Sequence, residues 1–238
     1  MPPEKTYWQE ICATFERLGG YFADPEIQAQ LLKLTGEHLN MSCMGVLLAF
    51  AVGLTASLLA SGRPRSELAV QSVANVFQTI PALALLAIFF AFMGSGYWTV
   101  VVTLALYAVL PVVKSCSAAL GDPHAELLEA GRGMGMSPTE LLWHIQIPQG
   151  LPVIISGLRI AFIYCIGSAT LAAFIGAGGL GEYIYRGLSI NNPARVLLGA
   201  IPIALLAIVI DLLLGLVEKK ARAWKNGRPA WGRGASIS

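Results

Sequence analysis

Five long runs of apolar residues alternate with short polar segments along the chain. The runs cover residues 40–61, 68–93, 98–119, 151–175 and 196–217. Each is long enough for a membrane-spanning helix, which needs about 20 mostly apolar residues. The apolar residues are continuous rather than alternating with period two, which favours helices over barrel strands. The pattern therefore predicts an all-α integral membrane protein with about five transmembrane helices.

The composition agrees with a surface that is largely covered by lipid. Of the 238 residues, 55% are hydrophobic and 13% are charged, whereas soluble proteins carry about 25% charged residues. The four cysteines are far apart and form no CxxC or Cys/His cluster. We therefore expect neither a disulfide framework nor a metal site.

The basic residues predict the orientation of the chain. Arg63 and Arg65 follow the first run, and six further Lys or Arg residues follow the last run. With five spans these two regions lie on one side, and the positive-inside rule makes that side cytoplasmic. The N-terminus is then external, and the C-terminus and the polar segment 120–150 are cytoplasmic.

Three regions follow from this pattern. Residues 1–37 carry apolar residues at helical spacing among charges, which predicts an external amphipathic segment lying in the membrane interface. Residues 38–220 form the transmembrane domain, including the cytoplasmic loop 120–150. Residues 221–238 are predicted to be a basic, disordered cytoplasmic tail.

Loop 120–150 begins with the signals of a short helix. Asp122 followed by Pro123 is typical of a helix N-terminus. A helix is expected over residues 124–132, and the flexible residues Gly133 and Gly135 supply its end.

A second short helix is expected immediately afterwards. The sequence from Ser137 to Glu140, SPTE, has the form of a capping box with proline at the first helical position. We expect this helix to end before Pro148, because a residue that precedes proline disfavours helical geometry. Its apolar face can pack on the membrane domain, and that face consists of Leu141, Leu142 and Ile145.

These signals alone leave two roles open for the helix pair. It is either a docking element for a protein partner or a purely structural feature. A nucleic-acid reader is excluded by charge, since Arg132 stands alone against four acidic residues between Asp122 and Glu140.

The loop resembles the EAA loop of ATP-binding cassette (ABC) importer permeases. That motif is Glu-Ala-Ala, then a glycine, then Ile-x-Leu-Pro. This sequence has EAG at 129–131, a glycine at 135 and IQIP at 145–148, and it departs from the motif at Gly131 and Ile147. In the family, the loop forms coupling helices that lie in a groove of the ATPase subunit. The residues to which the resemblance assigns ATPase coupling are Glu129, Ala130, Gly131, Gly133, Met134, Gly135, Ser137, Ile145, Ile147 and Pro148.

Three stretches resemble the osmoprotectant branch of this family, which serves glycine betaine, choline and carnitine. They are residues 76–86, 129–136 and 169–181, and the likeness covers residues 36–220. It implies the type I ABC importer permease fold and a location in the bacterial cytoplasmic (inner) membrane.

The resemblance also implies the partners. They are two ATPase subunits, a second copy or paralogue of this permease, and a separate extracellular substrate-binding protein. ATP and Mg²⁺ are then bound by the ATPase and not by this chain, whose sequence contains no GxxxxGK[ST] motif. The chain is expected to be non-catalytic.

Polar residues and helix breakers within the spans are candidates for a translocation path or gate. Pro81 frees a backbone carbonyl in mid-membrane, and such groups face protein or a wet path rather than lipid. A kinked helix with hydrogen bonds between helices is the alternative. The glycine-rich run 176–181 forms either an external gate, a receptor-docking surface or a plain turn. The candidate residues are Asn75, Gln78, Thr79, Pro81, Ser168, Thr170, Gly176, Gly178 and Gly179.

Two charged residues fall inside the predicted spans. Arg159 and Asp211 lie at similar depth near the cytoplasmic side. An unpaired charge is costly there, so we expect these two residues to form a structural ion pair. Recognition of a charge on the substrate is the alternative role.

The predicted function is the membrane-spanning pore subunit of an importer for quaternary-amine osmoprotectants. Alternatives are the same architecture with another cargo, such as ergothioneine or an amino acid, and a secondary transporter or channel that acts alone. A membrane scaffold whose loop recruits a soluble partner is a further alternative.

Overall fold

The computed structural model describes residues 7–121 and 125–227, and these residues form helices and turns without a strand. The predicted all-α class is confirmed for this part of the chain. The elements are α1 (Tyr7–Ala23), α2 (Pro25–Ala60), α3 (Pro64–Thr79), α4 (Ala82–Met93), α5 (Tyr97–Leu120), α6 (Ala125–Gly133), α7 (Pro138–Leu141), η1 (Leu142–Gln146), α8 (Ile147–Ser168), η2 (Ala169–Ile175), α9 (Gly181–Ser189) and α10 (Pro193–Gly227).

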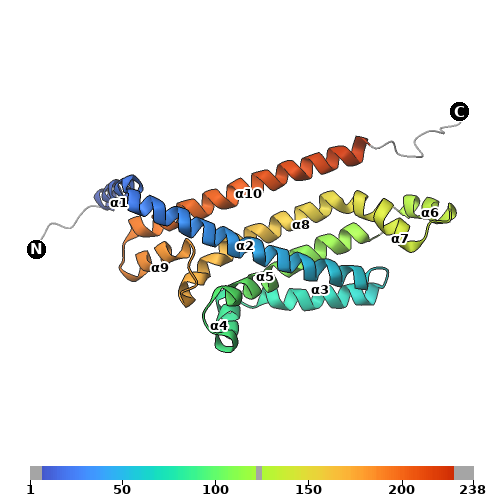
Figure 1. Ribbon diagram of the computed structural model, residues 1–238, viewed down its shortest axis with the longest axis horizontal. Coiled ribbons are helices and arrows are strands. Elements are labelled where there is room, and N and C mark those ends of the chain that lie inside the picture. The colour runs from blue at the N-terminus through green and yellow to red at the C-terminus, as the bar shows by residue number, and fades with distance from the viewer. Residues whose placement is uncertain (1–6, 122–124, 228–238) are drawn as a thin grey trace, which may run out of the picture.

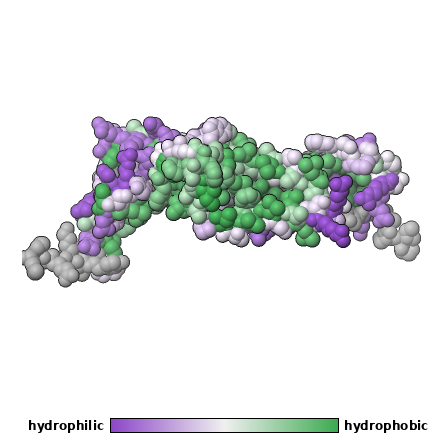
Figure 2. All heavy atoms as spheres, turned by 90° about the horizontal axis from the view of Figure 1, so that it is seen from below, coloured by the Kyte–Doolittle hydropathy of each residue, from purple (hydrophilic) through white to green (hydrophobic). Residues whose placement is uncertain are grey.

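The long helices α2, α5, α8 and α10 run along the length of an elongated bundle (Figure 1). Four helical segments of the described chain are long and apolar enough to cross a membrane, and the bent pair α3–α4 is a fifth candidate. An apolar band lies across the middle of the molecule between polar ends (Figure 2). This distribution is that of a multi-pass membrane protein, whose middle faces lipid.

Helix α5 forms the centre of the bundle and packs between α2 and α8. Glycine residues at the contacts allow the helices to approach closely. A Cβ at Gly45 of α2 would lie 2.8 Å from Leu104 Cβ, and one at Gly53 would lie 2.7 Å from a methyl group of Val112. On the other side, a Cβ at Gly157 of α8 would collide with the Ser115 side chain. Small residues at these contacts are what close helix packing in a membrane requires.

The second predicted span, residues 68–93, is not one helix. It breaks after Thr79, and α3 and α4 meet at an angle of 93°. Ile80 and Pro81 both have extended backbone at the break. The physical cause is the proline, which cannot donate a hydrogen bond into a continuing helix and which restricts the residue before it.

Helix α2 begins earlier than the first predicted span. Asp24 caps it, since its side chain accepts a hydrogen bond from the Glu26 amide, and Pro25 opens the first turn. The helix has 36 residues and is therefore about 54 Å long, which exceeds the hydrocarbon core of about 30 Å. The predicted boundary between residues 37 and 38 thus falls inside a helix.

The two ends of the chain differ from the prediction in extent. In α1, Leu18 is buried in a cluster with residues of α9 and α10, while Trp8 and Phe15 remain exposed. An amphipathic first helix is thus present. Helix α10 continues to Gly227, so the predicted disordered tail 221–238 begins as helix. The rest of that tail, residues 228–238, lies outside the described residues.

The packing of α5 on α8 predicts the effect of a larger residue at the contact. Gly157→Val should lower the free energy of unfolding by about 1–3 kcal/mol, because the new side chain meets Ser115 and the backbone carbonyl of Pro111. Gly167→Val on the same helix is the matched control, since nothing lies within 4 Å of its Cβ position. Thermal unfolding of the purified protein in detergent, followed by tryptophan fluorescence, measures both. Equal midpoints for the two variants would contradict the packing argument.

Candidate functional site

The predicted helix pair is present at one end of the bundle, beyond the end of α5 (Figure 1). Helix α6 ends at Gly133, and Gly135 turns the chain with φ +83°, a conformation that favours glycine. The capping box is present as predicted. The Ser137 amide donates to Glu140 Oε2 at 2.7 Å, and the Glu140 amide donates to Ser137 Oγ at 3.3 Å. The predicted cap at Asp122 and Pro123 lies outside the described residues.

The two short helices pack on each other at Gly131. A Cβ at this position would lie 2.6 Å from Leu141 Cδ2 and 3.0 Å from Ile145 Cδ1. Part of the face that was expected to pack on the spans therefore packs on α6. The same contact explains the glycine at the third position of the motif, where the family has alanine: Leu141 and Ile145 occupy the space of that methyl group.

The second helix does not end before Pro148, so that prediction is wrong. Helix α7 continues through the π-helical turn η1 into α8, with Pro148 in the first turn of α8. In η1 the Ile147 amide donates to the Leu142 carbonyl, five residues earlier. Such a wide turn leaves room for the proline ring beside the preceding turn. It also accommodates the hydrogen bond that the Pro148 nitrogen cannot donate. The second helix of the pair and the following span are consequently one continuous helix.

The outer surface of the helix pair is open to solvent. Met134 at its tip is 75% exposed and Trp143 on η1 is 62% exposed. The other predicted coupling residues divide into two groups. Exposed are Glu129, Ala130, Gly133, Gly135 and Ser137, and buried or half-buried are Gly131, Ile145, Ile147 and Pro148. An exposed methionine and tryptophan among small residues suit contact with another protein.

The predicted path residues of α3, with Pro81 after it, lie in different surroundings. Gln78 is half-buried, and its Nε2 donates to the Tyr107 carbonyl on α5 at 3.4 Å. Asn75 and Pro81 are exposed. Thr79 is also exposed, and its hydroxyl donates to the Val76 carbonyl within its own helix. Gln78 is therefore the member of this group with a hydrogen bond to the central helix.

The glycine-rich run folds tightly onto α2. Gly176, Gly178 and Gly179 all have positive φ, so glycine is required there. The Gly179 amide donates to Glu37 Oε2 at 3.2 Å, and a Cβ at Gly178 would collide with the same carboxylate. The run is therefore a packed turn at the end of the bundle opposite the helix pair (Figure 1).

Neighbouring contacts hold the same end. The Tyr183 hydroxyl of α9 donates to Gln30 Oε1 of α2 at 2.9 Å, and burial raises the pKa of this phenol. His38 is fully buried, and its Nε2 lies 2.9 Å from the Ile166 carbonyl. The predicted path residue Thr170 donates its hydroxyl to the Gly167 carbonyl.

The structure brings Arg159 and Asp211 together. Arg159 Nε and Nη2 donate to the two carboxylate oxygens of Asp211 at 2.5 and 2.7 Å. Arg159 Nη1 also donates to Glu218 Oε2 at 3.3 Å, and Glu218 in turn accepts from Arg222. This cluster connects α8 to α10 by a two-pronged ion pair, the geometry in which arginine pairs best.

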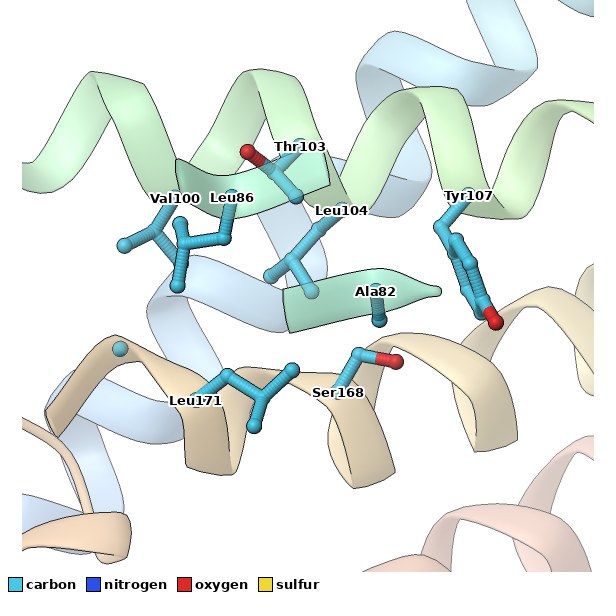
Figure 3. Close-up of a pocket in the computed structure, with 9 residues that line it drawn as sticks. Ala82, Leu86, Val100, Thr103, Leu104, Tyr107, Ser168 and Leu171 are labelled. Atoms are coloured by element: carbon cyan, nitrogen blue, oxygen red, sulfur yellow. The ribbon is translucent and has the colours of Figure 1, made fainter. Parts of the chain in front are cut away.

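A small cavity lies where α4 and α5 meet the end of α8. Thr103 and Tyr107 of α5 face Ser168 and Leu171 across Ala82, the first residue of α4 (Figure 3). Its volume is about 10 Å³, room for about one water. Ser168 therefore lines a water-sized cavity between α4, α5 and the end of α8.

A larger groove lies further along α5. It has a volume of about 380 Å³ and is lined by residues of α3, α5 and α8, among them Gln78, Lys114, Ser115, Ser156 and Tyr164. This volume falls in the range of small-molecule sites, about 300–1,000 Å³.

The sequence of the chain matches a known transport family over most of its length. Residues 45–223 match the family described as "binding-protein-dependent transport system inner membrane component". The chain belongs to this family. It is thus a permease and a multi-pass inner-membrane protein.

Several curated relatives of this chain are permeases that are named for the transport of osmoprotectants. The permease is 39% identical to the glycine betaine/carnitine/choline transport system permease protein OpuCB of Bacillus subtilis, over 80% of this chain and 88% of that protein. It is 39% identical to the carnitine transport permease protein OpuCB of Listeria monocytogenes over 79% and 86%. It is 36% identical to the osmoprotectant import permease protein OsmY of Salmonella typhimurium over 79% and 80%.

The fold also has a solved counterpart. An inward-facing structure of the MetNI methionine ABC transporter superposes with a TM-score of 0.75 at 23% identity, over 83% of this chain and 99% of that chain. At this identity the similarity concerns the fold. The expected type I importer permease architecture is confirmed.

Two charged residues of the permease, Glu218 and Lys114, were not among the predicted site residues. Glu218 follows Asp211 by seven residues and precedes Arg222 by four, so all three lie on one face of a helix. That spacing was the available signal for the larger cluster. Lys114 is the one Lys or Arg in the run 98–119, and a lone cation in a span is itself a signal.

The ion-pair cluster predicts that single and double substitutions differ. Arg159→Gln should lower the yield and the thermal midpoint of the permease, because it leaves the Asp211 carboxylate without its partner in a poorly solvated place. Asp211→Asn should act similarly, and the double variant should recover part of the loss. The amount of monodisperse protein extracted from membranes measures each effect.

The control is an exposed pair of the same kind. Arg186 on α9 pairs with Glu182 at 2.9 Å, with its side chain 59% exposed, and exposed pairs contribute little. Arg186→Gln should therefore leave yield and midpoint unchanged. If Arg159→Gln behaves in the same way, the cluster is not structural.

Proposed function

We propose that this permease is the membrane-spanning pore subunit of an ATP-driven importer for quaternary-amine osmoprotectants, namely glycine betaine, choline and carnitine. The observation that carries the proposal is the similarity to an osmoprotectant permease over 80% of the chain. The exposed surface of α6 and α7 supports the same conclusion, since an external motor needs an accessible contact on the pore.

The proposed assembly has two permease subunits, identical or paralogous, and two ATPase subunits that bind ATP and Mg²⁺. A separate substrate-binding protein delivers the cargo from outside. The proposed orientation puts the helix pair, the α2–α3 turn and the end of α10 in the cytoplasm. In support, these three regions lie at one end of the bundle (Figure 1), and Arg63, Arg65 and the basic residues of α10 lie there.

The proposed coupling uses the continuity of α7, η1 and α8. A displacement of the docked helix pair passes into α8 without an intervening loop. Helix α8 packs on α5 and is tied to α10 through Arg159 and Asp211, so the three helices move together. The chain itself does no chemistry in this scheme, and ATP hydrolysis is carried out by the partner subunits.

Two alternatives make different predictions. An importer for another solute, such as ergothioneine or an amino acid, keeps the partners and changes the cargo. A secondary transporter or channel needs no ATPase. The extended similarity to osmoprotectant permeases disfavours both.

Reconstitution of the whole system tests the proposal. The permease should be purified with its ATPase and substrate-binding protein and placed in liposomes. We expect uptake of labelled glycine betaine, carnitine or choline that requires ATP inside the liposomes and the binding protein outside. Uptake of only an amino acid would assign another cargo, and uptake without ATPase would contradict the class.

The proposed coupling role predicts loss of ATPase stimulation at the tip of the helix pair. In Gly135→Asp a side chain and a charge enter the docking surface, and substrate-stimulated ATP hydrolysis should fall by about tenfold or more. Gly62→Asp is the matched control, because Gly62 also has positive φ (+75°) and open space at its Cβ position but lies in the α2–α3 turn. Hydrolysis and co-purification of the ATPase are the two readouts. Equal behaviour of the two variants would remove the coupling assignment.

A further inference from the structure

Lys114 is a cation within a membrane-spanning helix that has no ion-pair partner among the described residues. It lies six residues before the end of α5 at Leu120, about 9 Å along the helix axis. Its side chain is exposed, although its neighbours Val113 and Ser115 are buried. A charge at this depth is costly unless it meets a polar environment.

The groove beside Lys114 provides such an environment. Gln78 comes from α3, Ser115 from α5 and Ser156 from α8, so three helices contribute polar groups to one surface. Polar side chains converging from several helices at membrane depth indicate a wet path rather than a lipid-facing surface. We therefore place the groove on the transport path.

The other end of the groove is aromatic. Tyr164 lines it and is 41% exposed. Its ring forms an edge-to-face pair with Tyr107, with ring centroids 6.4 Å apart. Tyr107 precedes Lys114 by seven residues, so both lie on one face of α5, about 10.5 Å apart along the axis. The groove thus has a cation at one end and the ring of Tyr164, backed by Tyr107, at the other.

These two ends match the two ends of a particular ligand class. A carboxylate forms charge-assisted hydrogen bonds with a lysine ammonium, and these bonds are strong where water is scarce. A quaternary ammonium is attracted to the face of an aromatic ring. Choline has the ammonium but no carboxylate, whereas glycine betaine and carnitine have both.

We propose that this groove is a substrate site in the permease that prefers zwitterions, with the carboxylate at Lys114 and the quaternary ammonium at Tyr164. The inference rests on the proposed function for the class of cargo and adds a site and a preference on this chain. Arg159 is not suited to the same role, because its charge is already paired with the carboxylates of Asp211 and Glu218.

Direct binding to the permease–ATPase complex, without the substrate-binding protein, tests the site. In nanodiscs, the affinity of the wild-type complex for labelled glycine betaine should exceed its affinity for choline by at least about tenfold. Lys114→Gln should remove this preference by weakening glycine betaine alone, and Lys114→Arg should keep it. Tyr164→Leu should weaken both ligands, and Tyr164→Phe, which keeps the ring, should weaken neither. Lys220→Gln, on the exposed part of α10, is the charge-matched control and should change nothing.

Several results would overturn the inference. They are no binding of either ligand to the wild-type complex, equal weakening of both ligands by Lys114→Gln, and loss of permease pairing in that variant, which would assign the cation to subunit contact. Uptake by the complete wild-type system is measured separately. Osmoprotectant uptake without these binding effects would leave the proposed function standing and remove the site, whereas absence of osmoprotectant uptake would contradict the proposed function itself.

Discussion

The close packing of α5 between α2 and α8 is the constraint on which the rest of the structure depends. In a membrane, burial of apolar surface does not drive helices together, so contact distance and shape decide which helices associate. Gly45 and Gly53 admit α5 on one side, and Gly157 admits it on the other. A helix held on both sides cannot rotate. Its polar positions, including Lys114, are therefore fixed relative to α3 and α8, and the groove between these helices has a defined lining.

The same packing connects the helix pair of α6 and α7 to the groove. The π-helical turn η1 allows α7 to continue into α8 past Pro148, and Gln146 within this turn donates to the Leu120 carbonyl at the end of α5 at 2.8 Å. That bond satisfies one of the terminal carbonyls that α5 leaves open. A partner that grips α6 and α7 thus acts on the ends of α5 and α8 at once, and these two helices carry most of the groove. Docking and transport can be coupled through two helix ends rather than through a flexible loop.

Hydropathy was sufficient to locate the membrane helices, because lipid requires long apolar segments wherever a span occurs. The capping box from Ser137 to Glu140 was also predictable, since its bonds are local. Two of the errors concern prolines, whose effect depends on surroundings that the sequence does not display. Pro81 breaks its span by 93°, whereas Pro148 is accommodated in a continuing helix by the turn before it. Contacts between distant segments, such as Glu37 with the Gly179 amide, had no local signal.

The two cations within the spans, Arg159 and Lys114, have different surroundings. Arg159 has a planar group with several fixed donors, and Asp211 and Glu218 hold it in place. Breaking such an ion pair in a poorly solvated place carries a large penalty. Lys114 has a flexible stem and a compact charge, and the helices around it supply hydroxyl and amide groups rather than carboxylates. Its charge is therefore free to meet the carboxylate of the proposed substrate.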